Sequence, residues 1–310
     1  MRIAAMGAGG VGGYFGARLQ QAGHDVVFFA RGKHLAALKE NGLTLKSPHG
    51  SAQLKVQVFE RPADAGAAVD VVMFAVKLWD TESAAELLRP VVGPKTLVIP
   101  FQNGVESVER LKKIFPAQNV LGGSAYIATR IAAPGVIEHI GQMAGLEFGA
   151  LMPSQRAAAA AFHGACQGAG INAKLADDIQ RVIWQKFIFL VAVSGCTASA
   201  RVPLGVVRAD PDLRWMFEQA MRETYRLARA RGVDVPEDYV GGRMAFLDTL
   251  PAEMRASMAH DLEAGNRLEA PWLCGAVAKM SAEAHLDAPV NRAIYAALKP
   301  FVDGSQGKAA

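Results

Sequence analysis

One charged residue, Lys186, stands in the otherwise apolar segment VIWQKFIFLVAVSG. In a helix, Lys186, Leu190 and Ser194 would share one face, because residues four apart lie above one another. An ammonium group held partly away from water there could protonate a carbonyl oxygen while a hydride arrives at the carbon. The alternative is a lysine whose carbon stem packs on apolar surface while its charge reaches water. The segment therefore offers Lys186 as a candidate general acid.

Two further segments carry polar residues at the ends of predicted elements. Asn103, in IPFQNGVES, follows a predicted strand in a glycine-containing turn, where a nicotinamide ring or a substrate would lie. An asparagine in a turn also occurs for purely backbone reasons. In ASMAHDLEAGNRLEAPW, a helix should end near Gly265 and a new one should begin near Glu269, with Pro271 in its first turn. Glu269 is then either a site residue at a helix N-terminus or a solvated surface charge.

The segment MGAGGVGGYFG contains the spacing Gly7-x-Gly9-x-x-Gly12 directly between a predicted strand and a predicted helix. In a dinucleotide-binding loop the first glycine permits the tight turn, the second lets the backbone approach a pyrophosphate, and the third lets helix and strand pack closely. The phosphates then lie at the positive end of the helix. A glycine cluster also occurs as a plain turn, but its position in a strand–loop–helix unit favours the dinucleotide. The predicted loop residues are Gly7, Ala8, Gly9, Gly10, Val11 and Gly12.

The second predicted strand, DVVFFARGKH, ends in Arg31, where an NAD enzyme keeps an acidic residue for the adenosine ribose. A carboxylate would repel a 2′-phosphate, whereas a guanidinium can bind it through two parallel hydrogen bonds. Lys77, at the end of the strand DVVMFAVK, would add a second positive charge at the same edge of the sheet. The alternative for Arg31 is an exposed residue that merely ends the strand. The pattern predicts NADP as the cofactor.

Predicted strands and helices alternate through the first half of the chain, which indicates a parallel sheet with right-handed crossovers. The strands cover residues 2–6, 25–30, 70–76 and 96–100, and the helices include 81–89, about 105–114, and 154–168. Residues 42–58 are expected to form an inserted hairpin, and 119–149 are expected to form strands that extend the sheet. From Asp177 onward helical periods prevail, with breaks at prolines. The prediction is an α/β Rossmann-type NADP-binding domain over 1–172, followed by an all-α substrate or dimerisation domain over 173–310.

The composition is that of a globular protein, with 310 residues, 51% of them hydrophobic and 20% charged, and a formal net charge of +4. Lysines and arginines are spread without a basic cluster or an aromatic stacking motif, which argues against nucleic-acid binding. The three cysteines lack metal-type spacing, so no metal site is predicted and a reducing compartment is expected. The longest apolar run, Phe187–Val193, is far shorter than the roughly 20 residues of a membrane span. We therefore expect a soluble cytoplasmic protein, and the apolar second half leaves a homodimer open.

Taken together, these segments resemble the ketopantoate reductase (2-dehydropantoate 2-reductase) family over essentially the whole chain. The resemblance is carried by GAGGVG at 7–12, Arg31, AVKLW at 75–79, QNG at 102–104, W-x-K at 184–186, and SMAHD…E from Ser257 to Glu269. Each motif is short, but their order and spacing along the chain are specific. The resemblance implies NADPH-dependent reduction of 2-dehydropantoate to pantoate, which belongs to pantothenate biosynthesis.

The resemblance also implies roles for individual residues. Lys186 would be the general acid, Asn103 would contact both the nicotinamide and the substrate, and Ser257 would hold the substrate carboxylate. Glu269 would contact the cofactor near the reacting centre, and Ala128, in YIATR, would make a backbone contact to NADP. A non-catalytic NADP sensor is the alternative of another class. Because a sensor needs none of the four polar side chains, their joint presence favours an enzyme.

Two positions depart from the family pattern. Family members usually carry asparagines four and eight residues after the catalytic lysine, whereas this chain has Leu190 and Ser194. Leu190 cannot form a hydrogen bond, and Ser194, which stays a predicted substrate contact, has a shorter reach than asparagine. A substrate hydroxyl left unpaired against Leu190 would cost about 1–3 kcal/mol. The alternatives to 2-dehydropantoate are therefore a less polar 2-oxo acid, or another substrate of the wider hydroxyacid dehydrogenase group.

Overall fold

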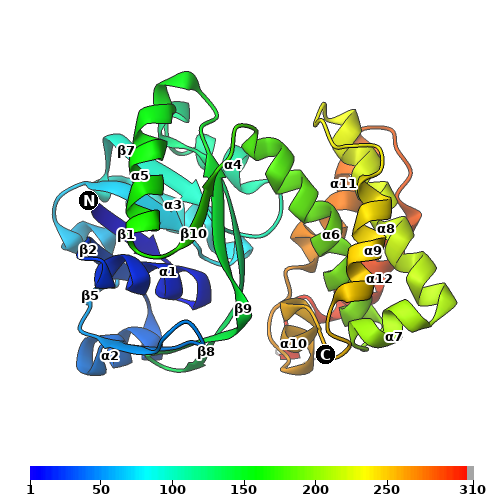
Figure 1. The fold of residues 1–310 in the computed structure, drawn as a ribbon, viewed down its shortest axis with the longest axis horizontal. Helices are drawn as coiled ribbons and strands as arrows, with labels where there is room; N and C mark the ends of the chain where they lie inside the picture. Colours follow the sequence, from blue (N-terminus) through cyan, green and yellow to red (C-terminus); the bar gives the residue numbers. More distant parts are fainter. Residues whose placement is uncertain (306–310) are drawn as a thin grey trace. The chain divides into compact units, whose positions relative to one another are not determined.

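The computed structural model describes residues 1–305 and divides the chain into two compact units, Met1–Val182 and a second unit that begins at Ile183 (Figure 1). All β-strands of the described residues belong to the first unit, and the second unit is built from helices. This arrangement confirms the predicted α/β fold followed by an all-helical part. The boundary predicted after residue 172 falls inside β10 (Asn172–Leu175), a strand that pairs with β9 (Val136–Gly149) of the first unit.

A five-stranded parallel sheet forms the centre of the first unit. Its order is β5-β2-β1-β6-β7, with β1 (Arg2–Met6) in the middle. The other strands are β2 (Asp25–Phe29), β5 (Gln57–Phe59), β6 (Val69–Phe74) and β7 (Val92–Pro100). Met6 pairs with Phe29 on one side and with Phe74 on the other. The carboxyl ends of β2, β1 and β6 therefore meet at one edge of the sheet, where ligands bind in folds of this kind.

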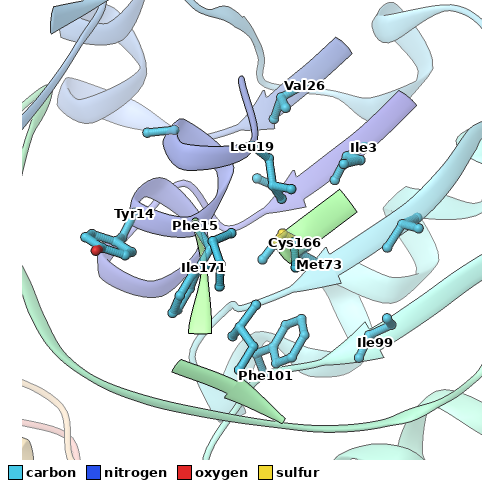
Figure 2. Packing of buried hydrophobic residues seen from close by; sticks show 14 of the residues in the cluster. Ile3, Tyr14, Phe15, Leu19, Val26, Met73, Ile99, Phe101, Cys166 and Ile171 are labelled. Carbon is cyan, nitrogen blue, oxygen red and sulfur yellow. The ribbon is translucent and has the colours of Figure 1, made fainter. Parts of the chain in front are cut away.

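Both faces of this sheet are covered, because alternate strand residues enter two different hydrophobic clusters. On one face, Ile3 belongs to one hydrophobic cluster with Phe15 and Leu19 of α1 (Gly10–Gln21), as Figure 2 shows. The other face is covered by α3 (Thr81–Leu88) and α4 (Ser107–Lys112), whose buried leucines belong to the second cluster. Burial on both faces explains why these strands read as unbroken apolar runs in the sequence.

Residues 122–149 do not extend the parallel sheet, so that part of the prediction is wrong, whereas Val120 forms an isolated parallel bridge with Val98 of β7. β8 (Gly122–Ala133) and β9 pair antiparallel in a second sheet of order β10-β9-β3-β4, where β8 joins through β9 alone. At the start of β8, a Cβ on Gly123 would lie 2.7 Å from the carbonyl oxygen of Pro100. This glycine lets the backbone of β8 pass close against the end of β7 instead of continuing the ladder beside it.

The predicted hairpin within residues 42–58 is present in part. β3 (Leu43–Lys46) and β4 (Ala52–Leu54) pair antiparallel, and β3 also pairs with β9 in the second sheet. The last stretch, β5, leaves the hairpin and runs parallel to β2 at the edge of the first sheet.

The remaining elements of the first unit are α2 (Gly32–Asn41), α5 (Arg156–Gly168) and the 3-10 turns η1 (Pro62–Ala65), η2 (Leu78–Asp80), η3 (Arg89–Val91), η4 (Ala117–Asn119) and η5 (Pro153–Gln155).

Prolines lie at several helix starts in the second unit, where the sequence predicts breaks in the helical pattern. Pro211 and Pro289 stand in the first turns of their helices, where the missing N–H costs nothing.

The helices of the second unit are α6 (Ile179–Ser199), which begins in the first unit, α7 (Leu204–Ala209), α8 (Pro211–Ala230), α9 (Tyr239–Thr249), α10 (Ser257–Glu263), α11 (Cys274–Glu283) and α12 (Pro289–Leu298), with the 3-10 turns η6 (Ala270–Trp272) and η7 (Lys299–Phe301).

A buried carboxylate holds the start of α12. Glu223 of α8 is 3% exposed and accepts backbone N–H groups of Val290 and Asn291, each at 2.8 Å. The side-chain amide of Asn291 donates a third hydrogen bond to it, at 2.7 Å. The first N–H groups of a helix have no partner within the helix, and its N-terminus favours negative charge. Glu223 therefore fastens α12 to α8.

Helix α6 is long and apolar enough to cross a membrane by length and composition alone, with a hydropathy of 1.5 over its most apolar window. The uninterrupted run Phe187–Val193 underestimates the length of the apolar segment, because the flanking residues are also largely apolar. Most of that window is nevertheless buried inside the protein. Burial by protein is what a core helix of a soluble protein shows.

Candidate active site

The glycine loop runs from the end of β1 into the start of α1, as predicted. Gly7 has φ of +92°, and a Cβ on it would lie 2.9 Å from the carbonyl oxygen of Ala75. A Cβ on Gly12 would collide with the carbonyl oxygen of Gly7. Both positions therefore exclude a side chain for reasons internal to the protein, namely the tight turn and the close approach of helix and strand.

Gly9 differs from these glycines, because its missing side chain leaves open space. The nearest atom to a Cβ there is the Ile131 Cδ1, at 3.9 Å, which is an ordinary contact. Gly9 is the N-cap of α1, and in this described helix no side chain caps the first turn and no acidic residue occupies it. Room beside the backbone together with the first N–H groups of a helix is what a pyrophosphate needs. The loop therefore fits the phosphates of NADP.

The second sheet supplies a wall of the glycine loop. A Cβ on Gly10 would collide with the hydroxyl oxygen of Thr129 in β8. Ala128, the predicted backbone contact to NADP, is the exposed residue just before Thr129. The pairing of β8 with β9 shifts register between Ile127 and Ala128, and such a bulge turns the backbone locally. Ala128 thus lies on the strand that borders the loop.

The side chain of His34 connects the glycine loop to neighbouring elements through hydrogen bonds, a role that the sequence did not predict. Its Nδ1 accepts the backbone N–H of Gly135 at 3.1 Å, so Nε2 carries the ring proton and donates it to the Ala8 carbonyl oxygen at 2.8 Å. The ring therefore links α2, the glycine loop and the turn between β8 and β9. Histidine is common on protein surfaces, and only these two partners reveal its role.

Arg31 lies at the end of β2, separated from its last residue by Ala30 alone, and is the N-cap of α2. Its side chain is 75% exposed, and its terminal nitrogen donates a hydrogen bond to Asp80 Oδ2 at 2.5 Å. Asp80 belongs to η2, the turn that follows β6. The structure therefore adds an acidic side chain to the predicted basic site. No local sequence signal pairs these two residues, which are 49 positions apart.

The residues Lys77 and Asn103 follow the neighbouring strands β6 and β7, and a glutamine joins their turns. Gln102 donates hydrogen bonds to the Val76 carbonyl oxygen and to the Thr81 hydroxyl, both at 2.9 Å. Lys77 is exposed at the start of η2, and Asn103 is half-buried. The carboxyl edge of the sheet therefore collects these two residues together with the glycine loop and the guanidinium described above.

In the second unit, Lys186 and Glu269 interact electrostatically. Lys186 of α6 is half-buried, and Glu269, the N-cap of η6, is 8% exposed. Burial of the ammonium group lowers the pKa of Lys186 from 10.5 to about 8, while the negative charge of Glu269 raises it and so limits the drop. A lysine with this pKa is protonated at pH 7 and can release its proton readily, which suits a general acid. A lysine with its charge fully in water would keep its ordinary pKa.

The local prediction around Glu269 is confirmed. Helix α10 ends before Gly265, which has φ of +68°, and η6 restarts the chain directly after Glu269 with a proline in its first turn. Ser257 is the exposed first residue of α10. On the Lys186 face of α6, Leu190 is half-buried and Ser194 is 1% exposed. The roles of these side chains toward a ligand stay predictions.

Family models match both halves of the chain. The model described as "Ketopantoate reductase PanE/ApbA" matches residues 3–153, and the model described as "Ketopantoate reductase PanE/ApbA C terminal" matches residues 178–302. The chain belongs to the ketopantoate reductase family. Ketopantoate reductases are NADP(H)-dependent oxidoreductases, so the predicted family, enzyme class and cofactor are confirmed. Reduction of a 2-oxo acid is the reaction that this membership supports.

Several relatives match this chain over almost their full length. A 2-dehydropantoate 2-reductase from Archaeoglobus fulgidus is 34% identical over 295 residues, which are 94% of this chain and 95% of the relative. An uncharacterized oxidoreductase, YkpB, from Bacillus subtilis is 29% identical over 301 residues, 97% of this chain and 99% of the relative. The crystal structure of a PanE/ApbA family ketopantoate reductase from Ralstonia eutropha superimposes with a TM-score of 0.88 at 31% identity, covering 97% of this chain and 98% of that chain.

Proposed function

We propose that this member of the ketopantoate reductase family reduces 2-dehydropantoate to pantoate. The observation that carries the proposal is the half-buried Lys186, whose pKa is lowered to about 8 by burial while the nearby Glu269 opposes the drop. When bound, NADPH supplies a hydride to the carbonyl carbon of the substrate. Lys186 holds the proton that the carbonyl oxygen then takes up.

The remaining site residues bind and orient in this proposal. The loop from Gly7 to Gly12 holds the pyrophosphate, and Arg31 and Lys77 pair with the 2′-phosphate. Asn103 orients the nicotinamide and the substrate, and Ala128 contributes a backbone contact to the cofactor. Support comes from the open space beside Gly9 and from the common sheet edge of these residues. On the helical unit, Ser257 and Ser194 bind the substrate, and Glu269 contacts the cofactor.

A less polar 2-oxo acid is the second candidate substrate, and Leu190 favours it. Leu190 is half-buried one helical turn after Lys186, and it has no polar atom to pair with a substrate hydroxyl. A site built to bond a hydroxyl rejects an analogue that lacks it by about 10⁴-fold or more, because the polar groups of the protein are left unpaired. A site lined by Leu190 would discriminate far less.

Catalytic efficiencies for 2-dehydropantoate and 2-oxoisovalerate, measured with the purified chain and NADPH, test the two candidates. 2-Oxoisovalerate lacks the hydroxymethyl group, so it differs by one carbon as well as by the hydroxyl. A strong preference for 2-dehydropantoate supports the proposed reaction, and similar efficiencies support the less polar substrate. Absence of NADPH oxidation with either compound, while NADPH still binds, would instead support an NADP sensor.

Location and assembly complete the proposal. We place the enzyme in the cytoplasm and its reaction in pantothenate biosynthesis, with the buried α6 as support for a soluble protein. A homodimer is proposed because large apolar side chains of the helical unit are exposed, among them Trp215 at 58% and Val206 at 44%. Light scattering on the purified protein tests this, and a mass equal to one chain at micromolar concentration would exclude it.

A further inference from the structure

The Arg31–Asp80 ion pair spans the strand end where the glycine loop begins. Arg31 follows β2 and Asp80 follows β6, and these two strands flank β1 in the sheet. A terminal nitrogen of the guanidinium donates a hydrogen bond to the carboxylate, at 2.5 Å. The pair therefore lies at the edge of the sheet from which the predicted phosphate-binding loop leaves β1.

The two partners are anchored very differently. The Arg31 side chain is 75% exposed, whereas that of Asp80 is 23% exposed. The backbone of Asp80 is held within its turn, because its N–H donates to the Lys77 carbonyl oxygen at 2.9 Å and its carbonyl oxygen accepts the Ser83 hydroxyl at 3.1 Å. The carboxylate is thus the fixed partner, and the long guanidinium side chain is the one that becomes ordered by the contact.

Asp80 does not use its side chain to cap the helix that it precedes. It is the N-cap of α3, where an aspartate carboxylate normally accepts N–H groups of the first helical turn. In the described chain its carboxylate makes no such capping hydrogen bond and is directed to Arg31 instead. At this position, a hydrogen bond between residues that follow two different strands replaces the helix-capping hydrogen bond.

The contact leaves Arg31 competent to bind a phosphate. A guanidinium has several N–H donors in a planar fork, and only one terminal nitrogen is engaged by Asp80. Ordering a flexible side chain before the ligand arrives removes part of the entropy cost of binding. The opposing effect is repulsion between the Asp80 carboxylate and a 2′-phosphate. That repulsion is weakened by water and salt, because the guanidinium between them is largely exposed.

We propose that Asp80 is a positioning residue that orders Arg31 for the 2′-phosphate of NADP and so contributes to the preference for NADPH over NADH. This inference rests on the proposed role of Arg31 in the cofactor site. It assigns Asp80 to selectivity between two cofactors, while Lys186 and the substrate side of the site are unaffected.

The test compares ligands that differ by the 2′-phosphate alone. Dissociation constants of 2′,5′-ADP and 5′-AMP are measured by calorimetry for the wild-type chain, Asp80→Ala and Asp80→Asn. Asp80→Ala should weaken 2′,5′-ADP by about three- to tenfold and leave 5′-AMP unchanged. Asp80→Asn, which can still accept the hydrogen bond, should show a smaller loss. In turnover, the KM for NADPH should rise while kcat stays the same.

A matched control and a double variant separate this proposal from the role of Arg31. Asp64→Ala removes the acid of another exposed pair of the same unit, Arg61–Asp64, and should change neither constant. In the background of Arg31→Ala, the further change Asp80→Ala should cause no further loss of 2′,5′-ADP affinity, because there is no guanidinium left to position and only the repulsion by the carboxylate is removed. If Arg31→Ala itself left the discrimination between the two ligands intact, the proposed role of Arg31 would fail, and the proposal for Asp80 with it.

Two results would overturn the Asp80 proposal while sparing Arg31. Unchanged or tighter binding of 2′,5′-ADP by Asp80→Ala would mean that the carboxylate repels the phosphate at least as much as it orders the guanidinium. An equal loss for 2′,5′-ADP and 5′-AMP would mean that Asp80 only maintains the local fold of η2.

Discussion

The carboxylate of Glu269 acts electrostatically on the ammonium group of Lys186, although the two residues are 83 positions apart in the chain. Burial disfavours the charged form of Lys186, and the negative charge of Glu269 favours it. The resulting pKa of about 8 lies just above neutral pH, so the group is mostly protonated at pH 7 and loses its proton a little above it. Two opposing electrostatic effects therefore set the pH range in which this lysine can act as an acid.

Turnover should fall as the pH rises through about 8, because only protonated Lys186 can donate to the carbonyl oxygen. The pKa is lowered in the folded protein, so the active form is present below that value and is lost above it. Lys186→Ala should reduce kcat by about 10²–10⁴-fold and abolish the alkaline decline, with little change in NADPH affinity. The measurement is a pH profile of kcat at saturating substrate. A folded variant with near-normal turnover would return Lys186 to a purely structural role.

Glu269→Gln should move the alkaline decline to lower pH. Removing the negative charge leaves burial unopposed, and the pKa of Lys186 falls further. The control is Glu263→Gln, which removes a half-exposed carboxylate that pairs with Arg255 in the same unit, and it should leave the profile in place. A decline at the wild-type pH in Glu269→Gln would show that Glu269 does not tune the lysine.

Arg31→Ala should raise the KM for NADPH by about ten- to hundredfold and leave NADH nearly untouched, since a charge-assisted hydrogen bond to the 2′-phosphate is lost. Steady-state kinetics with both cofactors measure the effect. Arg61→Ala serves as control, because Arg61 is 72% exposed and also pairs with an aspartate of the same unit. Equal losses for both cofactors would argue against a 2′-phosphate contact.

Gly9→Ala and Gly10→Ala should separate cofactor binding from folding. A Cβ on Gly9 meets only an ordinary contact at 3.9 Å, so thermal stability should hardly change. The affinity for NADPH should fall by about tenfold or more, equivalent to about 1.4 kcal/mol, because the methyl group occupies the approach of the pyrophosphate. A Cβ on Gly10 collides with Thr129, so Gly10→Ala should lower the free energy of unfolding by about 1–3 kcal/mol. Thermal melts and NADPH titrations measure both; a destabilised Gly9→Ala that binds normally would reverse this assignment.

Glu223→Ala should lower the free energy of unfolding by about 1–3 kcal/mol, because the buried N–H of Asn291 and the partly buried N–H of Val290 lose their acceptor. Denaturant unfolding measures it. Glu218→Ala, which removes a partly exposed pair with Arg222 on the same helix, should cost less than about 1 kcal/mol. Similar costs for the two variants would mean that Glu223 does not fasten α12.

The sequence by itself determined those features that depend on neighbours along the chain. Apolar runs followed by glycine or a charged residue specified β1, β2, β6 and the end of β7 in the first sheet, though not β5, and the loop from Gly7 to Gly12, because these features follow from local periodicity and backbone freedom. The basic Arg31 at the end of a strand indicated NADP in the same way. Prolines marked helix starts in the second unit, since the lack of an N–H is a property of the residue itself.

Tertiary structure alone decided the features that depend on residues far apart in the chain. Residues 122–149 have strand character, yet their local pattern cannot say that they pair in a second sheet and not at the edge of the first. The positions of Thr129 beside Gly10 and of Gly135 beside His34 follow from that pairing. Contacts between distant residues depend on which strands become neighbours and in what register, and this choice minimises the free energy of the whole unit. For that reason the sequence did not predict a role for Asp80, whose carboxylate accepts a hydrogen bond from the Arg31 guanidinium in the folded chain.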